Sequence, residues 1–318
     1  VFIQNFTPRV LKKFALEYED VRIIKPDIVM VSSTGYGHVG PWSNYGAIGY
    51  TTEAASGLAH MTGYIDGPPM LPEIPYADYT AAEHTAYAIM VALIHRSHTG
   101  QGQFIDVSQS ETVTSTIPEA ILDYTFNGRI SDRMGNSDAE MIPHGCFRCR
   151  GEAAWIAIAI DSNDSWDRFC RVLGKNEWYS DDRFYNPTLR RKHESILNNE
   201  INKETSQWDA RELMRSLQAN GVAAGVVLDG SELLFDPHLN ERSFFEIQHH
   251  PASTNMPPLP YASRPWKFSK TPGRLNSSAP TLGEHNEFIL CEILGLDKIS
   301  FERPQKDQNF IDNGSYVT

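Results

Sequence analysis

Short extended segments alternate with helical ones along the first part of this chain, and this alternation constrains the fold more than any other feature. Apolar runs typical of strands occupy residues 1–6 and 27–33, and residues 104–126 begin extended and then turn helical. Helix-forming runs occupy residues 8–16 and 49–61. Strands separated by helices predict an open, mainly parallel sheet with helices on both faces. The first half is therefore expected to be an α/β domain.

The sequence changes character near residue 130, which predicts a second, smaller α+β domain. Residues 129–143 are polar and irregular, and residues 144–150 and 155–160 then resemble the two strands of a hairpin. From residue 235 the chain is rich in proline, as a linker that crosses between domains would be. A last helix is expected over 282–295. We predict three regions: a large domain at 1–130, a small domain at 131–234, and a linker with a return to the large domain at 235–318.

Composition limits the classes of protein to which the chain can belong. Its 318 residues are 41% hydrophobic, which is enough for a large core and two domains. The net charge is −12, with 28 basic and 40 acidic residues, so a groove for nucleic acid is not expected. Apolar runs are too short to span a bilayer. We see no signal peptide, and because the chain opens without Met inside a strand-like run, it reads as cut at its N-terminus.

Asp78 is the strongest candidate for a reactive side chain. It ends the extended run 74–78 and directly precedes the apolar helix expected at 79–96. An aspartate in this place often caps the helix. Here Thr80 and Glu83 form a T-x-x-E capping box, so Thr80 is the expected N-cap and Asp78 is left free. A free carboxylate at a helix N-terminus is favoured in its anionic form and can act as a nucleophile.

The four cysteines indicate a reducing compartment rather than a metal or redox site. Cys146 and Cys149 make a C-x-x-C pattern, but they lie in a predicted strand, where residues three apart point to opposite faces. Cys170 and Cys291 are solitary on predicted helices and supply no second ligand pair. We expect packed thiols and no metal.

A glycine-rich loop at 35–40 matches the pattern of a dinucleotide fingerprint, G-x-G-x-x-G. In that fingerprint the last glycines open a helix whose N-terminus holds the pyrophosphate. Here Pro41 and several poor helix formers follow, and no acidic residue ends a strand about 20 residues later. The sequence therefore predicts no NAD site. The loop can still approach a ligand closely and present backbone amides to an anion or a tetrahedral oxyanion. His38 is either a wall residue of that site or an ordinary loop residue.

Several segments resemble the class III CoA-transferases, the CaiB/BaiF family of formyl-CoA and carnitine CoA-transferases. In that family the residue matching Asp78 is the catalytic nucleophile. The resemblance implies a Rossmann-like large domain, a discontinuous layout with a small domain in the middle, and interlocked homodimers. It also implies that the first strand–helix units of the nucleotide-binding domain are missing from this chain. The segments that carry the resemblance, in the family's order, are 1–16, 25–42, 54–69, 76–111, 143–160, 236–245 and 279–296.

The resemblance also implies which residues contact coenzyme A. Lys13 replaces an arginine that is frequent in the family, so a two-pronged phosphate contact becomes a single point charge. Thr34 stands where some members carry a lysine. The alternative for residues 5–14 is that Phe6 belongs to the core and that Lys12 and Lys13 form a solvated face of a helix. The residues assigned to coenzyme A are Asn5, Phe6, Lys13, Phe14, Thr34, Gly35, Tyr36 and Gly37.

Two further positions separate this chain from particular relatives. Residues 143–145 align with a polyglycine loop of the formyl-CoA members, but residues 139–142 here are Ala-Glu-Met-Ile, so a glycine lid is not expected. His144 is expected to brace the linker rather than face the site. Ala47 falls where the α-methylacyl-CoA racemases of this fold carry a histidine, and alanine cannot accept a proton. That substitution argues against racemisation.

The expected function is transfer of coenzyme A from an acyl-CoA donor to a carboxylic acid, through an aspartyl-CoA thioester on Asp78. Coenzyme A is then a substrate, and neither metal nor NAD takes part. The expected partners are an acyl-CoA, a small acid and a second copy of the chain, without nucleic acid or membrane. The expected compartment is the cytoplasm or an organelle matrix. Two alternatives remain open: an acyl-CoA isomerase or racemase of the same fold, and a fragment that binds coenzyme A without catalysis.

Overall fold

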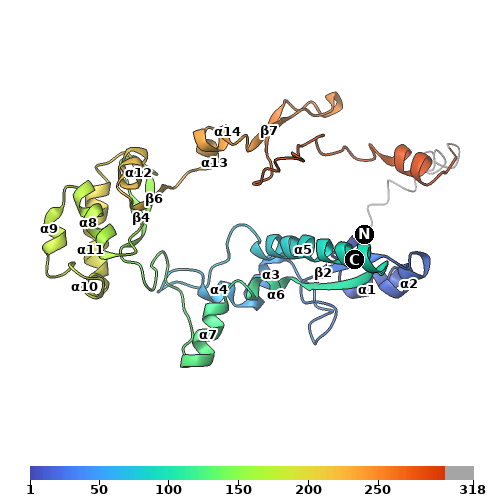
Figure 1. The fold of residues 1–318 in the computed structure, drawn as a ribbon, viewed down its shortest axis with the longest axis horizontal. Coiled ribbons are helices and arrows are strands. Elements are labelled where there is room, and N and C mark those ends of the chain that lie inside the picture. Colours follow the sequence, from blue (N-terminus) through green and yellow to red (C-terminus); the bar gives the residue numbers. More distant parts are fainter. Residues whose placement is uncertain (298–318) are drawn as a thin grey trace. The chain divides into compact units, whose positions relative to one another are not determined.

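The computed structural model describes residues 1–297, which fold as a mixed α/β protein (Figure 1). The described chain divides into two compact units, with the boundary between Val226 and Val227. The first unit contains a parallel three-stranded sheet near its start and an antiparallel three-stranded sheet near its end. The second unit contains a two-stranded hairpin. The domain boundaries predicted at residues 130 and 234 remain predictions.

The parallel sheet confirms the prediction made from the alternating segments. Its strands are β1 (Phe2–Gln4), β2 (Val29–Thr34) and β3 (Gln103–Ser108), in the order β1-β2-β3. Strand β2 is buried on both sides, as a central parallel strand should be. Met30 packs with Leu11 and Ile28 on one side of it.

Helices connect and cover the three strands. The helix expected at 49–61 is interrupted at Gly57, whose φ of 94° places it in the left-handed region that favours glycine. Helix α5 packs along β2 and β3 and is the longest in the described chain (Figure 1). The helices of this part are α1 (Pro8–Lys13), α2 (Tyr18–Ile24), α3 (Gly49–Ser56), α4 (Leu58–Met61), α5 (Tyr76–Thr99), α6 (Gln109–Thr114) and α7 (Pro118–Asn127).

The sequence prediction was wrong at the start of α5. Residues 74–78 are not a strand, and Thr80 is not the N-cap, because the helix already begins at Tyr76 with Pro75 as its N-cap. The Thr80 hydroxyl instead donates to the carbonyl oxygens of Tyr76 and Ala77 inside the helix, at 3.2 Å each. The helix starts early because a partner distant in sequence holds its first turn. The Glu53 carboxylate of α3 accepts a hydrogen bond from the Ala77 amide at 3.2 Å.

The antiparallel sheet and its helices form the largest core of the described chain. The predicted hairpin is confirmed, with β4 paired to β5 and β6 added beyond it. One face of this sheet packs on helices through buried side chains that include Phe147, Ile156 and Trp166. The elements are β4 (His144–Arg148), β5 (Trp155–Ala159), α8 (Asn163–Val172), α9 (Asn176–Ser180), α10 (Pro187–Lys192), α11 (Glu194–Thr205), α12 (Ala210–Ala219) and β6 (Ala223–Val226).

A buried arginine joins several segments of this core. The Arg190 guanidinium donates to the carbonyl oxygens of Ile142 and Phe184 and to the side-chain oxygen of Asn163, at 3.0, 2.9 and 2.9 Å. It also lies over the Trp166 ring, 5.1 Å from the ring centroid. Burial lowers the pKa of Arg190 to about 10, so the group stays charged at neutral pH. Its hydrogen bonds offset part of the cost of burying that charge.

Residues 227–297, the described part of the second unit, have little regular structure, in agreement with their many prolines. The helix expected at 282–295 is shorter than predicted and differs in type, since residues 286–293 are helical and Phe288–Ile293 forms a π-helix (η2). The predicted return of this segment to the large domain stays a prediction. The other elements are α13 (Gly230–Leu234), α14 (Pro237–Glu241), β7 (Phe245–Gln248), the 3₁₀ helix η1 (Ala252–Thr254) and β8 (Leu259–Ala262).

Candidate functional site

Asp78 lies in the first turn of α5, and its carboxylate is exposed. Its amide donates to the Pro75 carbonyl oxygen at 3.1 Å, which fixes the backbone at the helix start. An acidic side chain in a first helical turn is favourably placed relative to the helix dipole. The backbone of Asp78 is therefore held in the helix, while its carboxylate oxygens stay accessible.

Two neighbouring helices bracket the two oxygens of this carboxylate. Gln109, the first residue of α6, donates from Nε2 to Asp78 Oδ1 at 2.8 Å. Gly49, the first residue of α3, lies against the other oxygen. A Cβ atom added to Gly49 would stand 2.7 Å from Asp78 Oδ2 and 2.4 Å from Pro75 Cβ. Only a residue without a side chain fits there.

Glu53 is a second carboxylate at this helix junction, and sequence reasoning missed it. Its side chain is fully buried, and Oε1 accepts the hydrogen bond from the Ala77 amide. Among the described residues, its Oε2 has no hydrogen-bonding partner. Glu53 ties α3 to the turn that carries Asp78, so it helps to position that side chain.

Asp78 opens into a cavity of about 560 Å³ at the carboxyl ends of the three parallel strands. Asn5 follows β1, Ser33 lies near the end of β2, and Gln109 follows β3. Ligands of open α/β sheets bind at this edge. The lining residues are Ile3, Gln4, Asn5, Ser33, Asp78, Ala82, Thr85, Ala86, Ile89 and Gln109.

The structure brings only part of the predicted coenzyme A set to this cavity. Asn5 lines it together with Asp78, whereas Phe6, Lys13 and Phe14 are exposed elsewhere on the segment from β1 to α1. Thr34 is buried at the end of β2, and its hydroxyl has no hydrogen-bonding partner among the described residues. The coenzyme A roles of these residues remain predictions.

The glycine-rich loop after β2 is irregular over residues 35–48, as expected from its composition. The Gly35 carbonyl accepts from the Ser110 amide at 3.0 Å, and Gly35 lies directly against Ala47. Gly37 has a φ of 78°. Tyr36 packs edge-on against Trp42, with ring centroids 5.6 Å apart.

His38 is directed back onto the sheet. Its amide donates to both carboxylate oxygens of Asp106, at 3.0 and 2.9 Å, and its ring Nε2 lies 2.5 Å from the Ser32 hydroxyl. The ring also meets the Phe104 ring, with centroids 5.2 Å apart. His38 does not line the Asp78 cavity. Its amide is already used, so this amide of the loop is not free to bind an oxyanion.

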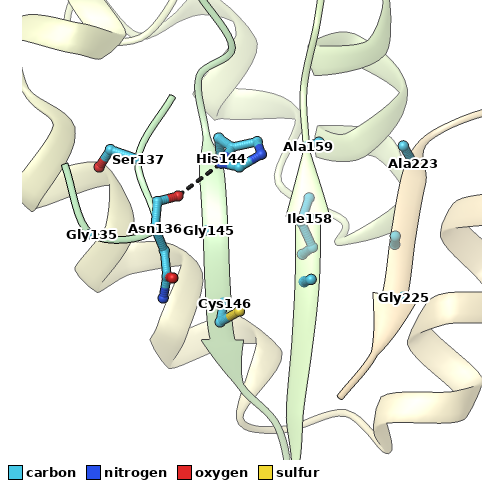
Figure 2. Close-up of a pocket in the computed structure, with 12 residues that line it drawn as sticks. Gly135, Asn136, Ser137, His144, Gly145, Cys146, Ile158, Ala159, Ala223 and Gly225 are labelled. Atoms are coloured by element: carbon cyan, nitrogen blue, oxygen red, sulfur yellow. Dashed lines mark hydrogen bonds between the residues drawn. The ribbon is translucent and has the colours of Figure 1, made fainter. Parts of the chain in front are cut away.

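A second cavity, of about 410 Å³, lies on the open face of the antiparallel sheet (Figure 2). Small side chains of β5 and β6 form its floor, and His144 and Cys146 of β4 lie beside them. The His144 Nδ1 is 2.8 Å from the Asn136 carbonyl oxygen, the contact that a bracing role for His144 requires. Cys146 in β4 is exposed, and Cys149, one residue beyond the end of β4, is buried, as two thiols on opposite faces would be.

The described residues, 1–297, contain neither a metal-binding cluster nor a membrane-spanning helix. No group of three or more histidine, cysteine or acidic side chains is arranged to hold a metal ion there. Within the same residues, no helix has the length and apolar character needed to cross a membrane.

These features define an α/β protein with a cavity at the carboxyl edge of a parallel sheet and an exposed aspartate that lines it. The profile of CoA-transferase family III matches residues 1–286, and the chain belongs to that family. The resemblance seen in the sequence is thereby confirmed.

Individual relatives agree with this family. The chain is 27% identical over 299 residues to a succinate–glutarate CoA-transferase of Agrobacterium fabrum, covering 94% of this chain and 73% of that protein. It is 29% identical over 294 residues to a succinyl-CoA–D-citramalate CoA-transferase of Chloroflexus aurantiacus, covering 92% and 72%. The crystal structure of a CaiB/BaiF family protein from Brucella suis matches with a TM-score of 0.81 and 27% identity, covering 92% and 74%.

Proposed function

We propose that this protein transfers coenzyme A from an acyl-CoA donor to a carboxylic acid, with Asp78 as the covalent relay. The observation that carries the proposal is an exposed carboxylate, fixed in a first helical turn, that opens into a cavity at the carboxyl edge of the sheet. Membership of CoA-transferase family III and relatives named as CoA-transferases support it. Two of those names contain succinate or succinyl-CoA, so succinyl-CoA is the first donor to test.

The reaction begins with attack of one Asp78 oxygen on the thioester carbon of the donor. The carbon–sulfur bond breaks, coenzyme A leaves as a thiolate, and Asp78 becomes a mixed anhydride. The thiolate then attacks the Asp78 carboxyl carbon, which forms an aspartyl-CoA thioester and releases the donor acid as a carboxylate. The acceptor carboxylate repeats both steps in reverse order and regenerates Asp78. This division of one exchange into several steps is nucleophilic catalysis.

The site has to exclude water during this cycle, because an anhydride hydrolyses readily. Three apolar side chains of α5, Ala82, Ala86 and Ile89, line part of the cavity, and six of its ten lining residues are polar. We propose that coenzyme A and the acyl groups complete the enclosure when bound. We also propose a homodimer, which light scattering on the complete gene product would test.

An exchange assay on the complete gene product tests the proposed function. Acyl-CoA donors and carboxylic acids are combined in a panel, and new thioesters are detected by mass spectrometry. Asp78→Asn should lose exchange, and hydroxylamine added during turnover should trap Asp78 as a hydroxamate. Deuterium entering the carbon beside the thioester, without any second acid, would support an isomerase or racemase instead. Binding of coenzyme A esters without any turnover would support a non-catalytic protein.

A further inference from the structure

Gln109 is held beside Asp78 by the packing of three helices. Its backbone carbonyl accepts from the Thr112 hydroxyl at 2.8 Å, and that hydroxyl lies 3.2 Å from the Thr80 hydroxyl of α5. The Thr114 hydroxyl donates to the Ser56 carbonyl of α3 at 3.2 Å. Helix α6 is thereby tied to both α5 and α3. The side-chain amide of Gln109 is therefore held beside Asp78 before any substrate binds.

We infer that Gln109 is the hydrogen-bond donor that stabilises the oxyanion formed at the Asp78 carboxyl carbon during transfer. The inference deepens the proposed function and rests on it. The Gln109 amide already donates to Oδ1 at 2.8 Å, which leaves Oδ2 as the oxygen that attacks the donor thioester. In the mixed anhydride, Oδ2 therefore carries the acyl group and Oδ1 remains the carbonyl oxygen beside Gln109.

The charge develops on the oxygen that Gln109 contacts. When the thiolate adds to the Asp78 carboxyl carbon, the carbonyl electron pair moves to Oδ1, which becomes an oxyanion. The carbonyl re-forms as the bond from the carboxyl carbon to Oδ2 breaks, and the donor acid leaves with Oδ2. No proton is consumed. A donor held about 2.7–3.1 Å from such an oxygen favours the transition state over the neutral anhydride.

The glycine-rich loop offers less for this role than its sequence suggests. The backbone amide of His38 already donates to the Asp106 carboxylate, so it is not available to an oxyanion. Gln109, by contrast, lies in the same cavity as Asp78 and directs its amide at the reacting carboxylate. A side-chain amide thus provides the contact that was predicted for backbone amides.

The test measures formation of the aspartyl-CoA thioester in a single turnover. The complete gene product is mixed with succinyl-CoA in the absence of an acceptor acid, and samples are quenched at intervals. Intact-protein mass spectrometry then measures the fraction that carries the coenzyme A adduct. Gln109→Met keeps the length of the side chain and removes the donor, and Gln109→His restores a donor. Gln101→Met, on the exposed turn after α5, is the matched control. Binding of succinyl-CoA and thermal unfolding are measured for each variant.

Gln109→Met should form the adduct about 10²-fold more slowly, by the usual cost of losing one oxyanion donor. Succinyl-CoA affinity and thermal midpoint should stay near those of Gln101→Met, and Gln109→His should recover at least a tenth of the wild-type rate. Wild-type rates in Gln109→Met would overturn the inference, as would a defect confined to affinity. If Gln109→Met unfolds, a Gln109→His variant that is folded but as slow as Asp78→Asn would also overturn it. Thioester exchange by Asp78→Asn would instead refute the proposed function.

Discussion

Replacing Gly49 with alanine tests whether the close packing around Asp78 sets the reaction rate. The added methyl carbon would lie 2.4 Å from Pro75 Cβ and 2.7 Å from Asp78 Oδ2. Carbon atoms in favourable contact are about 3.5–4.0 Å apart, so α3 and the first turn of α5 have to separate by about 1 Å. Gly49 does not have a positive φ, so backbone strain does not contribute to this effect.

Both stability and rate follow from that displacement. Overpacking costs about 1–3 kcal/mol, and the better helix propensity of alanine offsets up to about 1 kcal/mol. The protein should remain folded, with a moderately lower free energy of unfolding. A shift of about 1 Å in a reacting group reduces turnover about 10²-fold. Gly49→Ala should therefore lose far more activity than stability.

The assay compares exchange rates at saturating donor and acceptor with urea unfolding of the same preparation. Gly46→Ala is the matched control, because Gly46 is exposed, has no atom within 4 Å of an added Cβ and lies on the loop directly before α3. A Gly49→Ala protein that exchanges thioesters at the rate of Gly46→Ala would refute the reasoning. It would show that the oxygen beside Gly49 takes no part in the chemistry.

Three predictions concern the rest of the chain. Arg190→Met should lower the free energy of unfolding by about 3 kcal/mol, since buried carbonyl oxygens lose their donor, and thermal unfolding measures this. Burial raises the pKa of Cys149 to about 11 and of Cys170 to about 12, so iodoacetamide should modify exposed Cys146 first, as peptide mapping would show. Hydrogen bonds lower the pKa of Glu246 from 4.5 to about 2. The free energy of unfolding that Glu246 contributes should be complete above pH 4.5 and should vanish as the pH falls toward 2. Urea unfolding at several pH values measures this, and Glu246→Gln should lack this pH dependence.

Local sequence signals were sufficient wherever a structure is decided by neighbouring residues. The alternation of apolar runs with helices predicted the parallel sheet, and two runs separated by a turn predicted the β4–β5 hairpin. The period of two along a strand predicted opposite directions for Cys146 and Cys149. In each case the apolar pattern that predicts the strand or helix lies within a few residues, although the strands that then pair, such as β2 and β3, are far apart in the sequence.

The start of α5 shows where such signals fail. A T-x-x-E pattern at Thr80 satisfies every local rule for a helix N-terminus. In the folded chain, Glu53 of α3 binds the Ala77 amide, and the helix begins four residues before Thr80. A cap that comes from another helix leaves no mark in the local sequence. The same limit hid Gln109, although its place directly after β3 could have indicated it, since ligands bind at the carboxyl ends of parallel strands.

The corrected start of α5 changes the chemistry that can be argued for Asp78. At the end of a flexible extended run, a carboxylate would have to be ordered by its substrate, and that ordering would reduce the binding energy available for catalysis. In a first helical turn, with Glu53 holding the turn and Gln109 and Gly49 beside its two oxygens, the carboxylate is ordered beforehand. A fixed nucleophile raises the rate of an attack that needs a narrow range of approach. The contacts that sequence reasoning missed are therefore the ones that support the proposed role of this aspartate as a covalent relay.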